Sequence, residues 1–171
     1  MLKKEVNVKN LGMMFAAILL FSSAAKAQVA SDLCVATFGD GKTFYAKVLS
    51  KSGAIVNTKM VHSESLYSFK NNTVTASEGA YKVGHECKSI KFYGTRVNDL
   101  AYVGDFVEVT FGDGAKFFAV VESVGNDGLA TKMLHSGNKY TIYSDGKVVA
   151  STGVYPVGHQ TKSLMKLTRR K

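Results

Sequence analysis

Four histidines are the side chains of this sequence with the clearest capacity for chemistry, and they recur in pairs. His62 and His135 lie 73 residues apart in matching segments, and His85 and His159 lie 74 apart. Neutral imidazole is a common ligand of zinc and copper. One hypothesis is a metal or anion site in each segment, formed by His62 with His85 and by His135 with His159. No Cys, Asp or Glu stands beside either pair in both segments at ligand spacing, so the competing interpretation is turn histidines bonded to the backbone.

Acidic side chains in repeated turns are the next candidates for catalysis. Asp40 and Asp113 each lie between two glycines. Aspartate in such a turn commonly bonds to the local backbone, so this placement does not indicate a catalytic carboxylate. The chain also lacks the G-x-S-x-G, H-E-x-x-H and phosphate-loop motifs. We therefore expect a protein that is not an enzyme and that uses no cofactor.

Aromatic and lysine side chains in matching positions predict a binding face for glycan strands or peptide. Tyr81, Tyr155, Lys88 and Lys162 belong to this pattern. The residues that we expect to contact the ligand are Tyr45, Tyr67, Phe118, Tyr140, Lys59 and Lys132. Tyrosine and phenylalanine are also ordinary strand residues, and that role is the alternative.

The elements that must position these residues come from a duplication. Residues 37–41 recur as residues 110–114, and the shift of 73 becomes 74 after one inserted residue. Identity holds at 25 of 55 aligned positions, far above chance. A repeat of fixed period indicates one structural unit used twice. We predict a first domain at 28–94, a connection at 95–102, and a second domain with a short basic tail at 103–171.

Period-two patterns predict that both copies are built from strands. Phe44, Ala46 and Val48 alternate with residues of the opposite face, and residues 117–121 repeat the pattern. Gly, Asn and Asp turn signals divide each copy into five or six short strands. A sheet this small must close or stack to protect its edges. We predict an all-β chain with two tandem small, partly open barrels.

The first residues indicate export. Lys3, Lys4 and Lys9 precede a short apolar run over residues 11–25, and Ala25-Lys26-Ala27 fits the small-residue pattern before a signal-peptidase site. We predict a cleaved signal peptide at 1–27 and a periplasmic or secreted protein; an uncleaved membrane anchor is the alternative. No later stretch is long and apolar enough to span a membrane.

Two cysteines accompany this predicted compartment. Cys34 and Cys87 occur in copy one alone, where Val107 and Thr161 are their counterparts. In an oxidising compartment a pair of cysteines is more often a structural bridge than a reactive site. We predict a Cys34–Cys87 disulfide, which requires the first and last strands of the barrel to lie close together. Two free thiols are the alternative.

The second copy resembles the opening of Tudor-like barrels, which are relatives of the Src-homology-type small barrel. The matching features are Gly104-Asp105 followed by valine, the Asp113-Gly114 hairpin, and the Phe117-Phe118 pair before an alanine. The resemblance implies a small barrel with a binding role, commonly for methylated side chains in an aromatic cage. Ser136 and Ser63 replace the loop tyrosine of that family, so the cage lacks one wall.

Charge and duplication complete the functional expectation. After residue 27 the chain has 18 Lys and Arg against 12 Asp and Glu, a net charge of about +6 spread over both copies. This even distribution does not indicate nucleic-acid binding. We expect an exported binding module that engages peptidoglycan or a protein partner of the envelope, because two linked weak sites gain from effective concentration. A structural spacer within an envelope assembly is the second hypothesis.

Overall fold

Alternating burial along each segment shows why this sequence forms strands. In Leu66–Lys70, for example, Tyr67 and Phe69 are buried while the two flanking residues are exposed. The computed structural model describes residues 32–170, and the regular elements within that range are all β-strands. The predicted all-β class is confirmed. Residues 1–27, the predicted signal peptide, lie outside the described range.

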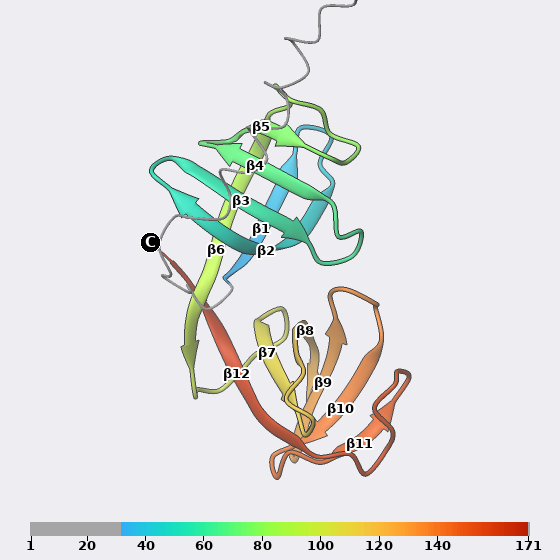
Figure 1. Cartoon of the computed structure of the whole chain (residues 1–171). Coiled ribbons are helices and arrows are strands. Elements are labelled where there is room, and N and C mark those ends of the chain that lie inside the picture. Colours follow the sequence, from blue (N-terminus) through green and yellow to red (C-terminus); the bar gives the residue numbers. More distant parts are fainter. Residues whose placement is uncertain (1–31, 171) are drawn as a thin grey trace, which may run out of the picture.

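Twelve strands follow one another in two series of six (Figure 1). Copy one consists of β1 (Leu33–Phe38), β2 (Thr43–Ser52), β3 (Ile55–Met60), β4 (Leu66–Lys70), β5 (Thr73–Ser77) and β6 (Cys87–Val97). Copy two consists of β7 (Phe106–Phe111), β8 (Lys116–Val124), β9 (Gly128–Met133), β10 (Lys139–Tyr143), β11 (Val148–Ser151) and β12 (Thr161–Arg169).

The two copies share their strand register as well as their sequence. Cys34 of β1 faces Ala46 of β2, and the equivalent Val107 of β7 faces Ala119 of β8. A register shift follows Val48 in β2 and recurs after Val121 in β8. The duplication predicted from the residues therefore extends to the irregularities of the backbone.

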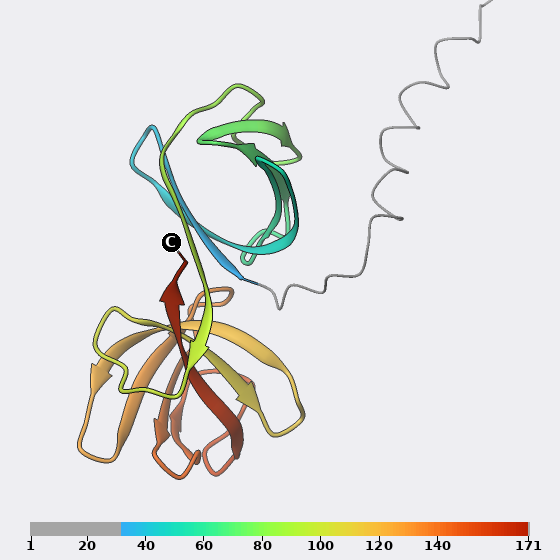
Figure 2. The same ribbon diagram turned by 90° about the vertical axis from the view of Figure 1, so that its left-hand side faces the viewer.

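All twelve strands form one continuous antiparallel sheet that curls at both ends. Its order is β11-β10-β9-β8-β7-β12-β6-β1-β2-β3-β4-β5, so β6 and β12 join the two copies at its centre. β6 pairs with β1 on one side and with β12 on the other, and β12 pairs with β7 on its second side. In Figure 2 copy one is seen curling into an open ring.

Each outer edge of the sheet is bonded to the loop that follows it. The amide of Val74 in β5 donates to the carbonyl of His85 at 2.9 Å, and the amide of Gly84 donates back to the carbonyl of Val74 at 2.8 Å. The equivalent bonds join Val148 to the segment Gly158-His159. These contacts satisfy backbone groups that an open edge would leave unpaired.

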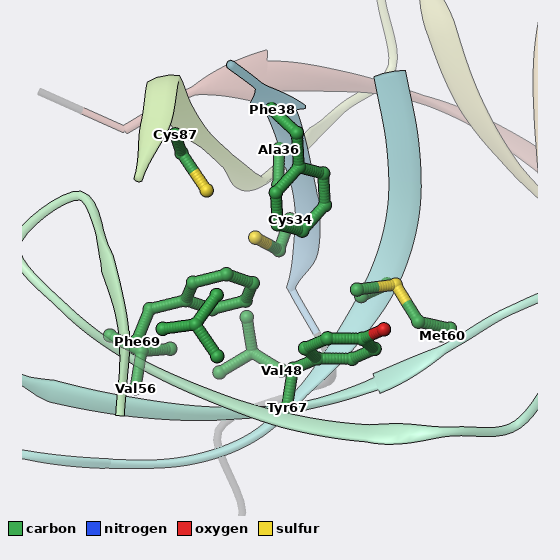
Figure 3. Close-up of a cluster of buried hydrophobic side chains, with 11 residues drawn as sticks. Cys34, Ala36, Phe38, Val48, Val56, Met60, Tyr67, Phe69 and Cys87 are labelled. Atoms are coloured by element: carbon green, nitrogen blue, oxygen red, sulfur yellow. The ribbon is translucent and has the colours of Figure 1, made fainter. Parts of the chain in front are cut away.

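Hydrophobic side chains form one core inside each curled copy. Phe38, Phe69 and Val74 lie at the centre of the first core, which Figure 3 shows in part. Phe111 and Val148 occupy the equivalent places in the second.

A third cluster, which we call the seam, lies between the copies. It contains four pairs of equivalent residues: Leu33 with Phe106, Tyr45 with Phe118, Val61 with Leu134, and Tyr93 with Leu167. The ring centroids of Tyr45 and Phe106 are 5.7 Å apart. The same surface of both copies therefore meets itself, as in an isologous dimer.

The predicted disulfide is absent, and both cysteines are free and buried. The predicted neighbourhood of the first and last strands is present, because β1 and β6 are paired. Their register, however, places Cys34 opposite Phe92 and Cys87 opposite Phe38. These positions are offset by four residues along β1, about 13 Å along a strand, whereas a disulfide requires Cα atoms within about 7 Å. Figure 3 shows both thiols facing the first core.

The predicted connection between the copies is partly strand. Residues 95–97 belong to β6 and pair with β12. The chain then turns through 98–105 into β7, and Ala101 is buried against the second core. Within 32–170 the structure contains no helix that could serve as a membrane span.

Candidate functional site

The aromatic residues expected to face a ligand are mostly buried. Phe118 lies in the seam and is 5% exposed, and Tyr45 lies partly buried beside it. Tyr67 and Tyr140 lie in the two cores at 5% and 3% exposure. The expected exposed face is therefore not formed by these four rings.

Tyr67 and Tyr140 instead organise the loops above them. The Tyr67 hydroxyl accepts a hydrogen bond from the backbone amide of Tyr81 at 3.3 Å. It also lies so close to Gly79 that no side chain could be added there, and Tyr140 has the same relation to Gly153. These tyrosines act as supports for the loops β5–β6 and β11–β12.

The predicted lysines lie at the two sides of the seam together with two of the histidines. One pocket of about 190 Å³ is lined by Lys59, Lys47 and His135, with Phe117 and Phe118 among its walls. A second pocket of about 340 Å³ is lined by His62 and Lys132. The pockets contain equivalent residues from opposite copies. Each combines the histidine of one copy with the lysine of the other.

The observed contacts of the histidines are with groups other than the partners of the metal hypothesis. His62 Nδ1 donates to the carbonyl oxygen of His135 at 2.9 Å, which joins the equivalent turns of the two copies. His85 packs on Phe38, with ring centroids 5.7 Å apart, and His159 packs similarly in copy two. Among residues 32–170 there is no group of three or more His, Cys, Asp or Glu that could hold a metal ion.

His135 has an environment that disfavours its charged form. Its ring stacks on Phe117 at 4.7 Å between centroids. Burial lowers the pKa of His135, and the nearby Lys47 and His62 act in the same direction. These surroundings therefore favour the neutral imidazole of His135 over its charged form.

A different set of residues forms a cluster of exposed and half-buried side chains at the far end of each copy. We call these sets the distal clusters. Copy one contributes Asp40, Tyr81, Val83, His85 and Lys88; copy two contributes Asp113, Tyr155, Val157, His159 and Lys162. In both figures that show the whole chain, the loops carrying them lie at opposite ends of the molecule (Figures 1 and 2).

The turn between β1 and β2 fixes the acidic member of the first cluster. Gly41 adopts a φ of 87°, which glycine tolerates without strain. The Lys42 amide then donates to Asp40 Oδ1 at 3.0 Å, as the sequence predicted for an Asp in such a turn. Lys88 Nζ lies above the same turn, 4.0 Å from the position a side chain at Gly41 would take.

A stacked tyrosine completes the cluster. Tyr81 lies parallel to the buried Phe38, with ring centroids 3.7 Å apart, and its hydroxyl donates to Asp40 Oδ2 at 2.9 Å. Tyr155, Phe111 and Asp113 repeat this arrangement, also at 3.7 and 2.9 Å.

These contacts influence the ionisation of both groups. The hydrogen bond from the Lys42 amide, assisted by the tyrosine hydroxyl, lowers the pKa of Asp40. Burial, together with the bond to Asp40, raises the pKa of Tyr81 to about 12. The cluster therefore presents a stable carboxylate and a neutral phenol beside an exposed lysine.

The sequence pattern places Tyr81 and Lys88 in the predicted binding face and His85 in the metal hypothesis, but it does not single out Val83. A better signal was available in the repeat. Asp40, Val83 and Lys88 are identical to their counterparts, and both members of each pair are exposed. Core packing explains identity at buried positions but not at these three.

The arrangement offers contacts to a ligand. Each distal cluster combines an exposed apolar side chain with one charge of each sign, which suits a surface that binds another molecule. Searches against protein-family models, curated proteins and solved structures find no match to this chain.

Proposed function

We propose that this chain is an exported, non-enzymatic binding protein whose two distal clusters engage a component of the cell envelope. The observation that carries the proposal is the repeated exposed valine. Val83 is 66% exposed and Val157 is 63% exposed. A single exposed valine is ordinary on a protein surface. The same exposed valine recurs two residues after the tyrosine that bonds to Asp40 or Asp113, and we infer that a shared ligand explains this repetition better than chance does.

Two equal sites at opposite ends suit a ligand that itself repeats. Peptidoglycan offers many copies of one glycan and peptide unit, so a chain with two weak sites gains affinity by binding twice. A protein partner present in two copies would gain in the same way and is the other envelope component that we consider.

Serine substitution of the exposed valines tests this proposal. Val83→Ser and Val157→Ser remove apolar contact area at positions where little folding energy is at stake. In sedimentation with purified peptidoglycan sacculi, we expect each single variant to weaken binding by about tenfold or more, because bivalent binding is lost. The matched control is Val103→Ser, since Val103 is 65% exposed and outside both clusters.

The same variants distinguish the two envelope components. Retention of the native chain by sacculi, lost in the double variant, supports peptidoglycan. Retention only from detergent-solubilised envelope proteins, lost in the same variant, supports a protein partner. Equal behaviour of the native chain and the double variant in both assays would contradict the proposal.

Two finer proposals accompany this function. We propose that each copy acts as a small Tudor-like or Src-homology-type barrel, supported by the bonds that tie β5 and β11 to their following loops. We also propose that the chain is cleaved after Ala27 and acts in the periplasm or outside the cell. The mass of the protein recovered from a periplasmic fraction should correspond to a chain beginning at Gln28.

The structural-spacer hypothesis also has a specific observation in its favour. Tyr45 and Phe118 are used to join the copies, which makes the molecule a continuous body rather than two modules on a flexible tether. If the chain is a spacer, it should copurify with assembly partners by size exclusion with light scattering, and the valine variants should leave that assembly intact.

A further inference from the structure

We propose that the open side of copy one binds a small amphiphilic carboxylate, such as a medium-chain fatty-acid anion, at a site separate from the distal clusters. A pocket of about 490 Å³ lies there. This volume falls within the usual range of about 300–1,000 Å³ for sites that hold small molecules. It is lined by residues of β2, β3 and β6 and by the end of β12.

The floor of this pocket is apolar and belongs to the first core. Val48 and Val56 line it at 8% and 6% exposure, and Ile90 and Phe92 complete the floor. An acyl chain placed here would cover carbon surface that the protein leaves accessible, at about 0.8 kcal/mol for each methylene group buried.

The rim of the pocket is basic. Lys51, Lys91, Arg169 and Arg170 all line it, against one acidic residue, Asp32. Arg170 is already engaged, since its Nε lies 2.7 Å from Asp32 Oδ2. Lys51 Nζ lies 5.9 Å from the centre of the Phe92 ring, between the rim and the apolar floor. A carboxylate at the mouth would therefore meet positive charge while its tail enters the floor.

Copy two shows why the site is expected once per chain. The corresponding pocket, of about 540 Å³, is lined partly by the connection at 98–101, and Ala101 from that segment is buried in the second core. Val124 stands where copy one has Lys51, and Asp99, Asp127 and Asp145 are among its lining residues. The second pocket is no smaller than the first, but the connection forms part of its wall, and its charged lining is three aspartates and Lys162 where the first pocket is mainly basic.

Calorimetric titration of the purified chain with decanoate tests the proposal. We expect one decanoate per chain, and octanoate to bind about fourfold more weakly for each methylene that it lacks. Decanol, which has the tail but no charge, should bind more weakly than decanoate. A stoichiometry of two, equal binding of decanol, or no heat with either carboxylate would overturn the proposal.

Rim variants locate the site without disturbing the core. Lys51→Gln combined with Arg169→Gln should weaken decanoate binding by about fivefold, since exposed charges contribute about 1 kcal/mol in favourable cases. The control is Lys147→Gln, an exposed lysine of copy two that lines neither pocket.

A variant of the floor tests the apolar part of the site. Val56→Phe should fill the floor and abolish binding, provided that its melting temperature shows a folded protein. Unchanged decanoate affinity in the rim variant would also overturn the proposal.

Discussion

Asp40 shows how a single residue joins distant parts of this chain. Its carboxylate accepts a bond from the Lys42 amide within its own turn and another from the hydroxyl of Tyr81, which follows β5. The first contact could be predicted from the Gly-Asp-Gly sequence, because it is local. The second could not, since it depends on how far the sheet curls. Local turn chemistry was therefore predictable at this site, and its tertiary partner was not.

The side-chain environment of His135 leads to a prediction about pH. The pKa of His135 is lowered from its ordinary 6.5 by burial and by Lys47 and His62. As the pH falls through 6.5, His135 takes up a proton in the unfolded chain but not yet in the folded chain. The free energy of unfolding therefore decreases as the pH falls, until the pH reaches the lower pKa of His135 in the folded chain. Above about pH 7.5 the effect is absent. Urea unfolding of the native chain at pH 7.5 and 5.5 should show this loss.

His135→Phe is the informative variant for this pH dependence. It keeps an aromatic ring to stack on Phe117 but cannot titrate. Its free energy of unfolding should decrease less than that of the native chain between the two pH values. Lys59 and Glu64 line the same pocket as His135 and remain unchanged in the variant. An identical decrease in both proteins would assign the pH dependence to other groups.

Among the strands, the register of β1 against β6 decides whether Cys34 and Cys87 can form a disulfide. Alternation and turn signals predict which segments are strands, and the prediction of β1 beside β6 is confirmed. Register depends on cross-strand contacts that a single sequence does not display. The same limit applies to Tyr45 and Phe118. Their positions in strands were predictable, but the face that becomes buried depends on a seam between copies that the repeat alone does not reveal.

Thiol labelling provides a prediction from this register. Cys34 and Cys87 are 0% and 5% exposed, and burial raises the pKa of their thiols to about 12 and about 11. Both should react with iodoacetamide at pH 8 far more slowly in the native chain than in urea, because the thiolate is the reactive form. Mass spectrometry should then count two labels per unfolded chain without prior reduction. No label before reduction, and two after it, would indicate the disulfide instead.

A charged contact across β12 supports the junction of the two copies. Arg96 of β6 donates through Nε to Glu108 of β7 at 2.9 Å and makes a second bond through Nη2. Glu108 is 4% exposed. Removing its partner would leave a buried carboxylate poorly compensated, because Lys116 approaches only to 3.8 Å.

Arg96→Met is therefore expected to lower the free energy of unfolding by about 3 kcal/mol. The double variant Arg96→Met with Glu108→Gln removes the charge as well as its partner and should recover part of this loss. Chemical denaturation of both variants measures the difference. If the double variant is less stable than Arg96→Met, uncompensated charge is not the cause of the loss.

At the scale of the whole molecule, duplication has produced one sheet with an internal two-fold relation. The repeat predicts two tandem barrels, and the six strands of each copy fit the predicted number, but the twelve strands form one curled sheet and not two separate barrels. The central pairing of β6 with β12 could not be inferred, because it joins segments about 70 residues apart in different copies. No turn signal in the sequence connects these two strands as a hairpin. The seam and this pairing together couple the folding of one copy to that of the other.

This coupling predicts a single cooperative unfolding transition. Differential scanning calorimetry should give one peak whose calorimetric and van't Hoff enthalpies agree, at about 100 kcal/mol for the described residues. Leu167→Ala removes a side chain that is 3% exposed in the seam. It should lower the free energy of unfolding by about 3 kcal/mol and shift the whole peak to lower temperature. If the native chain gave two separate peaks, or if the variant shifted only half of the enthalpy, the copies would be folding independently and the seam would be a contact between domains rather than part of a common core.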